Sequence, residues 1–417
     1  MLSYLIRRVL LFFPTLIGAT FLVFGLLSAA PIKVTDVLLP PGGDLRPGIR
    51  EQREAYLNER YGLNDPFVLR YFRWLNNASP IGLRVWQFDE PEVIAARAKR
   101  REWRSAEEAR LKAADPALAG DALRHAVDAA ERTAEAAGQV DFRPRPGQFR
   151  FDRWPVKAPD LGDSYIHQRP AHELILSALP VTLLLNFLSL PLAVLISVVT
   201  GVWAARHRGK WQDWGTGGVL LALSSIPQIW VGVLFIGFLC NVEYLRWFPP
   251  AGLESLRAPR MSFFPQTVNG EWSPGYLLDA TWHLVLPVVC LTYAQFAYLS
   301  KIARTSLLEV LGSDYVRTAR AKGLADGVVL WRHAFRNALI PIITVLAALL
   351  PTIIAGSVVV ETIFSINGMG RLLIESLKRG DNEVFLSLTL ITLLVTVTAY
   401  LLADVAYALA DPRVSYD

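Results

Sequence analysis

Apolar residues in this chain gather in long runs that polar residues rarely interrupt. A helix needs about 20 apolar residues to cross the hydrocarbon core of a membrane. Six runs satisfy this requirement: Val9–Ala30, Leu174–Ala204, Gly217–Cys240, His283–Leu299, Leu339–Val360 and Phe385–Leu409. The pattern is typical of membrane proteins and predicts an all-α polytopic fold with six transmembrane helices.

The first run has a second interpretation, as the core of a secretory signal peptide. Arg7 and Arg8 precede it, and a small-residue Ser-Ala-Ala sequence ends it. However, the run is longer than a usual signal core, and the later runs need an anchor of known orientation. We therefore expect the first helix to be retained.

Lysine and arginine are concentrated in alternate short loops. Two arginines precede the first run, three cations lie within residues 206–210, and residues 301–336 hold seven Lys/Arg against three Asp/Glu. Residues 241–282 and 361–384 each carry three positive and four negative side chains. Because cytoplasmic loops carry the excess of Lys and Arg, we expect both termini to face the cytoplasm.

This orientation divides the chain into three parts. Residues 1–30 form the cytoplasmic N-terminal end and the first span, and residues 31–172 form an extracytoplasmic domain between the first and second spans. Residues 173–417 form a five-helix membrane core, with a cytoplasmic loop at residues 301–338.

The extracytoplasmic part is expected to be mostly helical. A turn at Asn64-Asp65-Pro66 precedes an aromatic-rich amphipathic stretch that ends at Leu75. Residues 90–138 are rich in Ala, Glu and Arg and are broken at Asp115-Pro116, which predicts a helical hairpin or a long solvated helix pair. This pair is either a charged surface decoration or an arm that docks a partner. The Pro- and Arg-rich stretch Arg143–Pro159 predicts an extended return segment.

Several kinds of chemistry find no support in the sequence. The chain is 53% hydrophobic with a positive mean hydropathy, and its two cysteines, Cys240 and Cys290, both lie in apolar runs. Neither a disulfide framework nor a CxxC metal site is therefore expected. The formal charge of +5 is clustered beside the apolar runs, where it serves orientation better than nucleic-acid binding. No P-loop, HExxH or GxSxG motif occurs, so we expect no catalytic residue and no nucleotide site.

Three polar residues, Asn186, Gln228 and Gln295, lie deep within the runs. They can bond between helices or line a pathway, and the sequence leaves both interpretations open. Six prolines also lie in the runs, at positions 180, 191, 227, 287, 341 and 351. Each favours a kink, which persists in lipid where neighbouring helices or a polar cavity satisfy the freed carbonyl groups. Kinked helices around a passage fit transport.

Two other functional classes were weighed. An ion-coupled carrier or channel would bury charged groups at mid-membrane, and the apolar runs hold few carboxylates. A membrane-embedded enzyme would need nucleophiles, bases or metal ligands in the extracytoplasmic domain, where His125, His167 and His172 have no matching partners in the sequence.

A short cytoplasmic helix is predicted just before the fifth run. Ser313 can cap its start, Asp314 lies in its first turn, and Gly323 can close it in the left-handed conformation. Small side chains at Ala319 and Ala321 allow another surface to approach closely. The bias of positive charge toward the cytoplasm explains its arginines, but not its small residues and closing glycine.

A second amphipathic segment follows this helix. Val328, Trp331, Phe335 and Ala338 recur at helical spacing on one side, and the segment passes directly into the fifth run. The two helices would therefore link a cytoplasmic surface to the membrane.

The sequence YVRTARAKGL, followed by WRHAFRNALIP, closely resembles the coupling loop of binding-protein-dependent ABC importer permeases of the dipeptide, oligopeptide and nickel family. Other matches include MLSYLIRRVLLFFPTL, YGLNDP, DLGDSYIHQRPAHELILSALPVTLLL, IPQIWVGVLFI, VVVETIFSINGMGRLLIES and DPRVSY. The family's leading Glu-Ala-Ala is here Arg317-Thr318-Ala319. The resemblance fails over Glu90–Arg153, which looks inserted into, or greatly enlarged within, the extracytoplasmic domain.

The resemblance implies the ABC type I importer permease fold in a bacterial inner membrane. The expected partners are a second homologous permease, two cytoplasmic ATPases and an extracytoplasmic solute-binding protein. ATP and Mg would be held by the ATPases, so no cofactor is expected on this chain. Peptides are the leading solute, with nickel chelates, sugars and peptide-like antibiotics as alternatives.

The resemblance also implies roles for particular residues. Coupling to the ATPase is assigned to a set in the short helix: Asp314, Arg317, Ala319, Ala321 and Gly323. Glu361, Asn367 and Gly370 lie in a glycine-punctuated stretch that the family suggests is a re-entrant or surface helix. We expect these three to contribute to gating or to docking of the binding protein, although a tight turn explains Asn367-Gly368 equally well.

Overall fold

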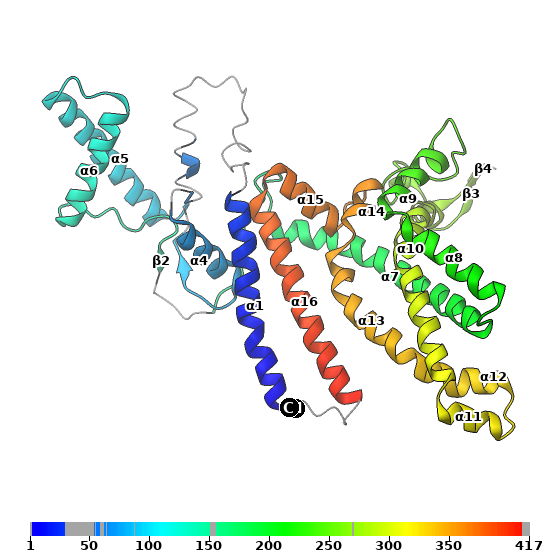
Figure 1. The fold of residues 1–417 in the computed structure, drawn as a ribbon. Coiled ribbons are helices and arrows are strands. Elements are labelled where there is room, and N and C mark those ends of the chain that lie inside the picture. Colours follow the sequence, from blue (N-terminus) through cyan, green and yellow to red (C-terminus); the bar gives the residue numbers. More distant parts are fainter. Residues whose placement is uncertain are drawn as a thin grey trace. The chain divides into compact units, whose positions relative to one another are not determined.

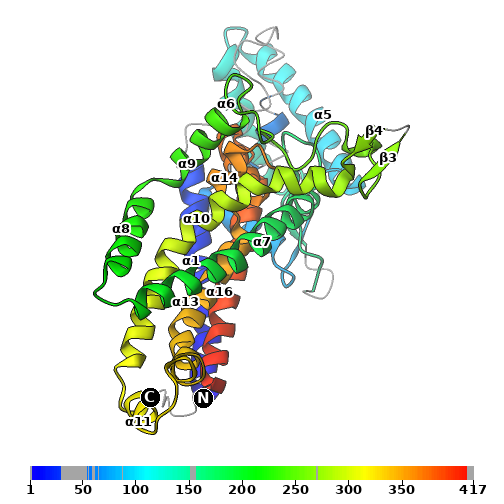
Figure 2. The same cartoon turned by 90° about the vertical axis from the view of Figure 1, so that its right-hand side faces the viewer.

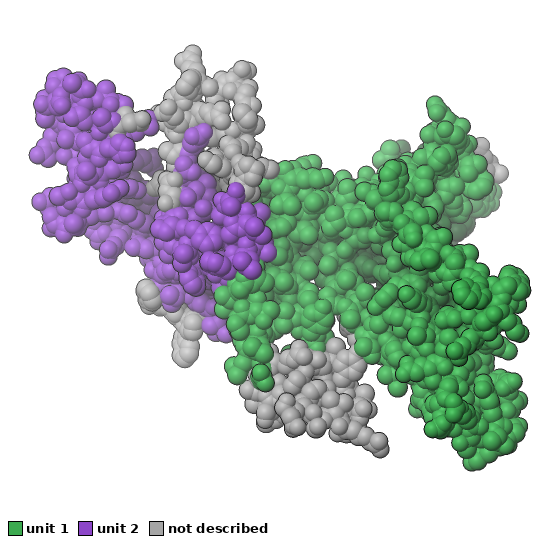
Figure 3. All heavy atoms as spheres, viewed as in Figure 1, with its two compact units in different colours: residues 1–20, 167–417 green, residues 21–166 purple. Residues whose placement is uncertain are grey.

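The computed structural model is mostly helical and divides into two compact units (Figure 1, Figure 3). Unit 1 comprises Met1–Thr20 and His167–Asp417, and unit 2 comprises Phe21–Ile166. The structure describes residues 2–29, 54, 56–58, 62, 63, 65–86, 88–150, 156–268 and 271–410. Tyr61 and Asn64 of the YGLNDP motif, part of the Arg143–Pro159 return segment and the DPRVSY sequence near the C-terminus lie outside these residues.

Helix α1 (Leu2–Ala29) is divided between the units, and its end from Phe21 onward lies in unit 2. The other elements of unit 2 are α4 (Phe67–Ala78), β1 (Arg84–Val85), α5 (Pro91–Ala114), α6 (Gly120–Ala136) and β2 (Phe149–Arg150). In unit 1 the helices are α7 (Ala171–Arg206), α8 (Trp211–Ser225), α9 (Gln228–Leu234), α10 (Gly275–Leu311), α11 (Asp314–Ala321), α12 (Asp326–Val328), α13 (Phe335–Ala355), α14 (Val358–Ile363), α15 (Met369–Arg379) and α16 (Asn382–Ala410). Unit 1 also holds π-helical turns at Phe235–Cys240 and Val329–Ala334, a 3₁₀ turn at Ala258–Arg260 and the hairpin of β3 (Gln266–Val268) and β4 (Glu271–Ser273).

Aromatic rings hold α4 against the end of α1. Tyr71 is almost completely buried and makes edge-to-face contacts with Phe21 and Phe24. Trp74 lies beside Phe24 in the same cluster. Aromatic pairs of this kind contribute about 0.5–1.5 kcal/mol each beyond the area they bury. The aromatic-rich stretch noted in the sequence is therefore a packed helix. Strand β1 follows α4 and pairs antiparallel with β2, which comes after α6; Val85 lies opposite Phe149.

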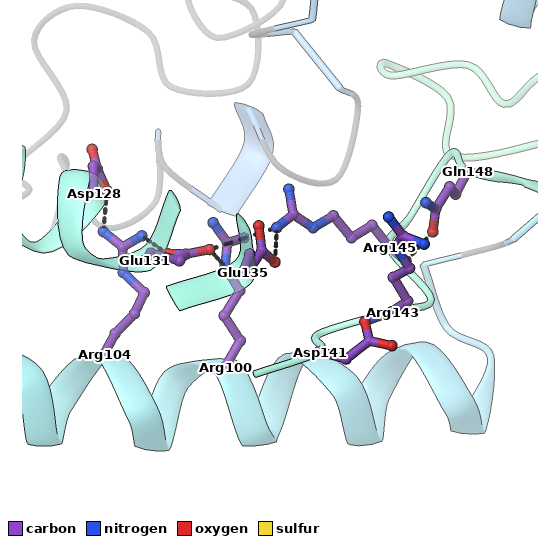
Figure 4. Close-up of polar contacts among 9 residues, drawn as sticks. All are labelled: Arg100, Arg104, Asp128, Glu131, Glu135, Asp141, Arg143, Arg145 and Gln148. Carbon is purple, nitrogen blue, oxygen red and sulfur yellow. Dashed lines mark hydrogen bonds and ion pairs between the residues drawn. The ribbon is translucent and has the colours of Figure 1, made fainter. Parts of the chain in front are cut away.

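The Ala-, Glu- and Arg-rich segment forms the predicted helical hairpin, α5 and α6, broken at Asp115-Pro116. Its helices are joined by a network of ion pairs (Figure 4). Glu131 is 4% exposed and accepts hydrogen bonds from Arg100 Nε at 2.6 Å and Arg104 Nη1 at 2.5 Å. Arg104 also donates to Asp128 at 2.6 Å. Burial alone would lower the pKa of Arg104, but its bonds and charge contacts with Asp128 and Glu131 outweigh burial and raise that pKa. The network therefore specifies how α6 lies on α5.

Replacement of Glu131 by alanine is expected to open this hairpin, because it leaves the cations of Arg100 and Arg104 without their shared buried partner. Losing one member of a buried ion pair costs about 3–5 kcal/mol. Hydrogen exchange of the α5 and α6 amides in the purified chain would measure the loss. Glu108, which pairs with Lys112 in an exposed position, supplies the control, and Glu108→Ala should leave exchange unchanged. Equal protection in the Glu131→Ala variant and the wild type would contradict the assignment.

Two long helices, α7 and α10, form the centre of unit 1 and pack along each other (Figure 1, Figure 2). Gly201 permits their close crossing, since a Cβ placed there would lie 2.6 Å from the Cβ of Ala303. Hydroxyl groups join the two helices just before this point in both of their sequences. Thr200 and Ser300 are 2.7 Å apart through their Oγ atoms, and Ser197 donates to the carbonyl of Phe296 at 3.0 Å. Small residues and interhelical hydroxyl bonds are typical of helices that pack within a membrane.

Four described helical stretches are long and apolar enough to cross a membrane: Leu10–Ala29, Ala171–Arg206, Gly275–Leu311 and Asn382–Leu402. Two more pass this test only when a bent pair is taken as one span. These pairs are Trp211–Ser225 with Gln228–Cys240, bent by 86°, and Asp326–Leu346 with Pro351–Ile363, bent by 43°. Length and composition of the described residues therefore provide four spans, or up to six.

The third and fifth runs are bent, as the prolines at 227 and 351 predicted. The third breaks at Ile226, which is extended, and Pro227, which has no N–H to continue the helix. The fifth bends between Leu346 and Pro351, and α13 then ends at Gly356 (φ +77°), before the predicted end at Val360. Apolar composition locates a span, but proline and glycine decide its course.

Candidate functional site

The short helix predicted before the fifth run is present as α11, and its last turn is closed as a Schellman motif. Gly323 has φ +79°, the left-handed region that favours glycine. Its N–H donates to the carbonyl of Arg320 at 2.9 Å, and the N–H of Leu324 donates to the carbonyl of Ala319 at 3.4 Å. These are the two bonds of the motif, and they satisfy carbonyls that the helix end would leave free. Ser313 precedes the helix, but its hydroxyl donates to the carbonyl of Val310 and makes no capping bond.

One face of α11 is fixed to unit 1. Val316 and Ala319 are buried in a cluster with residues from α7, α10, the π-helical turn and α13: Val202, Ala205, Leu307, Val329, Leu330, Ala334 and Ala338. Ala319 was expected to leave room for another surface, but its side chain packs inside its own chain. The small side chain instead lets α11 approach α7 and the π-helical turn. The buried face of α11 thus belongs to an apolar cluster that it shares with α7, α10, the π-helical turn Val329–Ala334 and α13.

The opposite face of α11 is exposed. Asp314 and Arg317 are open to solvent, and their side chains are 3.4 Å apart. Ala321 and Gly323 are exposed as well, and a Cβ added at Gly323 would meet no other atom within 4 Å. Four of the five residues assigned to coupling therefore lie where a partner can reach them. An exposed pair of this kind contributes little to stability, so its charges are available for recognition.

After the turn at residues 322–325, a continuous helical path leads into the fifth run through α12, the π-helical turn Val329–Ala334 and α13. The sequence predicted an apolar face of Val328, Trp331, Phe335 and Ala338, but Val328 and Trp331 are exposed. The buried positions are Val329, Leu330, Ala334 and Ala338. The prediction is confirmed for Phe335 and Ala338 and wrong for Val328 and Trp331, because a π-helical turn takes more residues per turn than an α-helix and changes which positions share a face.

A second group of predicted residues surrounds the carboxylate of Glu361 in α14, which is 1% exposed. Its Oε1 accepts from Thr182 Oγ1 of α7 at 3.0 Å and from the N–H of Ser357 at 3.2 Å, and its Oε2 accepts from the N–H of Arg371 at 2.9 Å. Thr182 Oγ1 in turn accepts from the N–H of Met369 at 2.8 Å. The direction of these hydrogen bonds is fixed. The N–H of Met369 can only donate, so Thr182 Oγ1 accepts from it and gives its one hydrogen to Glu361.

Two glycines make room for this carboxylate, and a third lets the backbones of α14 and α15 approach closely. A Cβ on Gly356 would lie 2.6 Å from Glu361 Oε1, and one on Gly368 would lie 2.5 Å from Glu361 Cδ. A Cβ on Gly370 would lie 2.6 Å from the nitrogen of Val358. The glycine punctuation in the sequence therefore reflects close approach around a buried acid. In the structure α14 and α15 form a turn that is fastened to α7.

The other predicted polar residues lie at separate places. Asn186 is buried and its Nδ2 donates to the carbonyls of Thr182 and Ile353, so it joins α7 to α13 beside the Glu361 group. Gln228 donates to the carbonyl of Cys290 at 3.1 Å and joins α9 to α10. The Oε1 of Gln295 is buried without a hydrogen-bond partner.

Asn367 is exposed and accepts from Arg371 Nη1 at 3.0 Å. The structure therefore brings Asn186, Glu361 and Gly370 into one neighbourhood, places Asn367 at its exposed edge, and leaves Gln228 and Gln295 apart.

Sequence reasoning missed Thr182, Gly356 and a buried ion pair between Asp213 and Arg304. The two nitrogens of Arg304, Nε and Nη2, each donate to one Asp213 oxygen at 2.7 Å. No pattern around Thr182 or Asp213 marks them, since their partners are far away along the chain. Asp213, Glu361 and Asp381 are buried, so the membrane part holds more buried carboxylates than its apolar runs indicated. The described residues hold no group of three His, Cys, Asp or Glu side chains that could bind a metal ion.

Comparison with known proteins matches residues 197–416 to a family model described as "Binding-protein-dependent transport system inner membrane component". The oligopeptide transport system permease protein AppB of Bacillus subtilis is 31% identical over 417 residues, covering 100% of both chains. The dipeptide transport system permease protein DppB of Alkalihalophilus pseudofirmus is 27% identical over 425 residues, again covering 100% of both. DppB of Escherichia coli is 33% identical over 297 residues, covering 69% of this chain and 86% of its own.

Proposed function

Since the chain belongs to the family of binding-protein-dependent transport system inner membrane components, we propose that it is a membrane permease subunit of an ATP-driven peptide importer. Its relatives with full-length similarity are named as oligopeptide and dipeptide permeases, which supports peptides as the solute class. No observation favours a nickel chelate, a sugar or an ion-coupled mechanism. ATP hydrolysis belongs to partner subunits, because the chain has no P-loop.

The observation that carries the mechanism is the construction of α11. Its exposed face bears Asp314, Arg317 and Ala321, while Ala319 on the other face is locked into the apolar cluster. A force on the exposed face would be transmitted in two ways: through the cluster to α7 and α10, and across the turn at residues 322–325 into the helix that continues to α13. ATP-driven closure of two ATPase subunits would use these routes to shift the membrane helices between two discrete arrangements.

The remaining parts of the assignment follow from the membrane orientation. Counting each bent pair as one span gives six spans with both termini in the cytoplasm, α11 on the cytoplasmic side and unit 2 mostly outside. A second, homologous permease would complete the pathway, and an extracytoplasmic binding protein would deliver the solute.

A pair of alanines on α11 tests the coupling role, because one is buried and the other is exposed. Ala319→Leu is expected to lower the stability of the chain by about 1–3 kcal/mol, the usual cost of overpacking a core. Ala321→Leu should leave stability unchanged but weaken co-purification with the ATPase by about tenfold, as a disturbed interface centre does. Thermal unfolding and quantitative co-purification measure the two effects. Normal ATPase binding by Ala321→Leu would contradict the coupling role.

A further inference from the structure

The turn between α7 and α8, residues 203–214, carries exposed tryptophans beside exposed cations. Trp211 is 79% exposed and Trp214 is 78% exposed. Trp203, one α-helical turn before the end of α7, is half exposed and its ring lies 4.4 Å from that of His207. The cations Arg206, Arg208 and Lys210 are all exposed as well. We refer to residues 203–214 as the α7–α8 turn.

The positive charge of this turn is only partly compensated, by the electrostatic interaction of Arg208 with Asp213. Asp213 is its one carboxylate, and both oxygens of that carboxylate are bound by Arg304 of α10. The N–H of Gly209 also donates to Asp213 Oδ2 at 3.1 Å. No carboxylate among the described residues lies within 4 Å of Arg206, Arg208 or Lys210. The Asp213–Arg304 pair therefore fixes the turn to α10 without neutralising the three cations.

The position of the turn suits the boundary of a membrane. Trp211 begins the bent pair that has the length and composition of a span, and α8 runs along the edge of unit 1 in both views (Figure 1, Figure 2). Farther along α8, Val219 and Leu221 are 59% and 69% exposed, as expected of a surface that faces lipid. Tryptophan is enriched at membrane–water interfaces, where its ring is buried and its N–H reaches water.

The turn lies at the end of the molecule that carries α11. Val202 and Ala205, in the last turns of α7, pack in the same apolar cluster as Val316 and Ala319 of α11. In the proposed orientation this is the cytoplasmic side, where anionic lipids attract cations that lie close to the surface. A protein surface would also use exposed Trp and Arg side chains, but the position of these residues at the end of a span favours lipid.

We propose that the α7–α8 turn binds the headgroup of an anionic phospholipid, with Arg206, Arg208 and Lys210 around the phosphate and Trp211 and Trp214 at the level of the glycerol backbone. This inference rests on the membrane orientation of the proposed function. The bound lipid would brace the end of α7 against which α11 packs, so lipid composition would influence the efficiency of coupling.

The test compares two charge-removing double variants of the full-length chain. Arg206→Gln with Arg208→Gln removes two cations from the turn, and Arg257→Gln with Arg260→Gln removes two exposed arginines from the loop before α10. Each protein is purified from mixed vesicles of phosphatidylglycerol and phosphatidylcholine, and the retained phospholipids are quantified. Wild type and the Arg257/Arg260 variant should retain phosphatidylglycerol preferentially. The Arg206/Arg208 variant should lose this preference by about thirtyfold, or about fivefold for each cation.

Further arms separate charge from folding and lipid from free phosphate. Arg206→Lys with Arg208→Lys should keep the preference, and 1 M salt should weaken it in the wild type, because screening shortens the range of charge interactions. Added inorganic phosphate should not displace the lipid. The proposal is overturned if the Gln variant retains the preference, if the Lys variant loses it, or if inorganic phosphate displaces the lipid.

If the variant with Arg206→Gln and Arg208→Gln lost ATPase binding in lipid-free detergent but kept its lipid preference, the turn would be identified as a protein contact. This outcome would also overturn the proposal. Failure of the wild type to bind any ATPase would instead count against the proposed function, independently of the lipid result.

Discussion

Replacement of Glu361 by alanine is expected to destabilise the chain by about 3–5 kcal/mol and to abolish solute uptake, because three donors lose their acceptor. The variant would leave the buried N–H groups of Ser357 and Arg371, and the hydroxyl of Thr182, without their acceptor. Each unsatisfied buried group costs about 1–3 kcal/mol. The turn of α14 and α15 would then detach from α7, so the effect reaches helices far from position 361 in the sequence.

Thermal unfolding of the purified variant and uptake in reconstituted vesicles measure these two effects. Glu375 is a suitable control, because it lies on the neighbouring helix α15, is partly exposed and bonds only to Arg371 Nε among the bonds described. Glu375→Ala should therefore cost about 1 kcal/mol or less. The destabilisation by Glu361→Gln should lie between those of Glu361→Ala and Glu375→Ala. The amide oxygen of glutamine can still accept, but its NH₂ group donates and would face N–H groups that need an acceptor. Wild-type stability in Glu361→Ala would show that the buried carboxylate does not hold the turn.

Replacement of Gly323 by proline is expected to abolish ATP-driven uptake while the chain still inserts into the membrane. Proline cannot adopt φ +79°, has no N–H for the bond to Arg320 and disfavours the helical conformation of the preceding Lys322. The end of α11 would unwind at a cost of about 3 kcal/mol. Because Gly323 is exposed and meets no neighbouring atom, the apolar cluster beneath α11 should survive.

The matched control for this prediction is Gly323→Asn. Asparagine tolerates the left-handed conformation and retains its N–H, so coupling should persist with a small loss of stability. Expression and membrane insertion are followed by detergent extraction, and coupling is followed by the ratio of solute transported to ATP hydrolysed. Unimpaired uptake by a normally expressed Gly323→Pro variant would count against a coupling role for α11.

Local signals account for what could be predicted of the candidate site. The closing glycine of α11 and the continuity of the following helix with the fifth run depend on residues that are close together in the sequence, and both were read correctly. Ala319 was placed on the wrong face because its environment is supplied by α7 and α13. The face assigned to Val328 and Trp331 was wrong because the sequence does not indicate a π-helical turn. The role of Glu361 as an internal acceptor was invisible, since Thr182 lies 179 positions away.

The sequence by itself determined the apolar helices, the hairpin of α5 and α6, and the capped helix α11. Each depends on composition or on bonds within a few residues, and a helix in lipid must satisfy its backbone internally. The prolines of the third and fifth runs already indicated kinks there. Tertiary contacts decided the burial of Ala319 and the assembly of Thr182, Gly356 and Glu361 around one carboxylate. These features require particular backbones to approach within van der Waals distance, and hydropathy along a chain contains no information about which distant segments will meet.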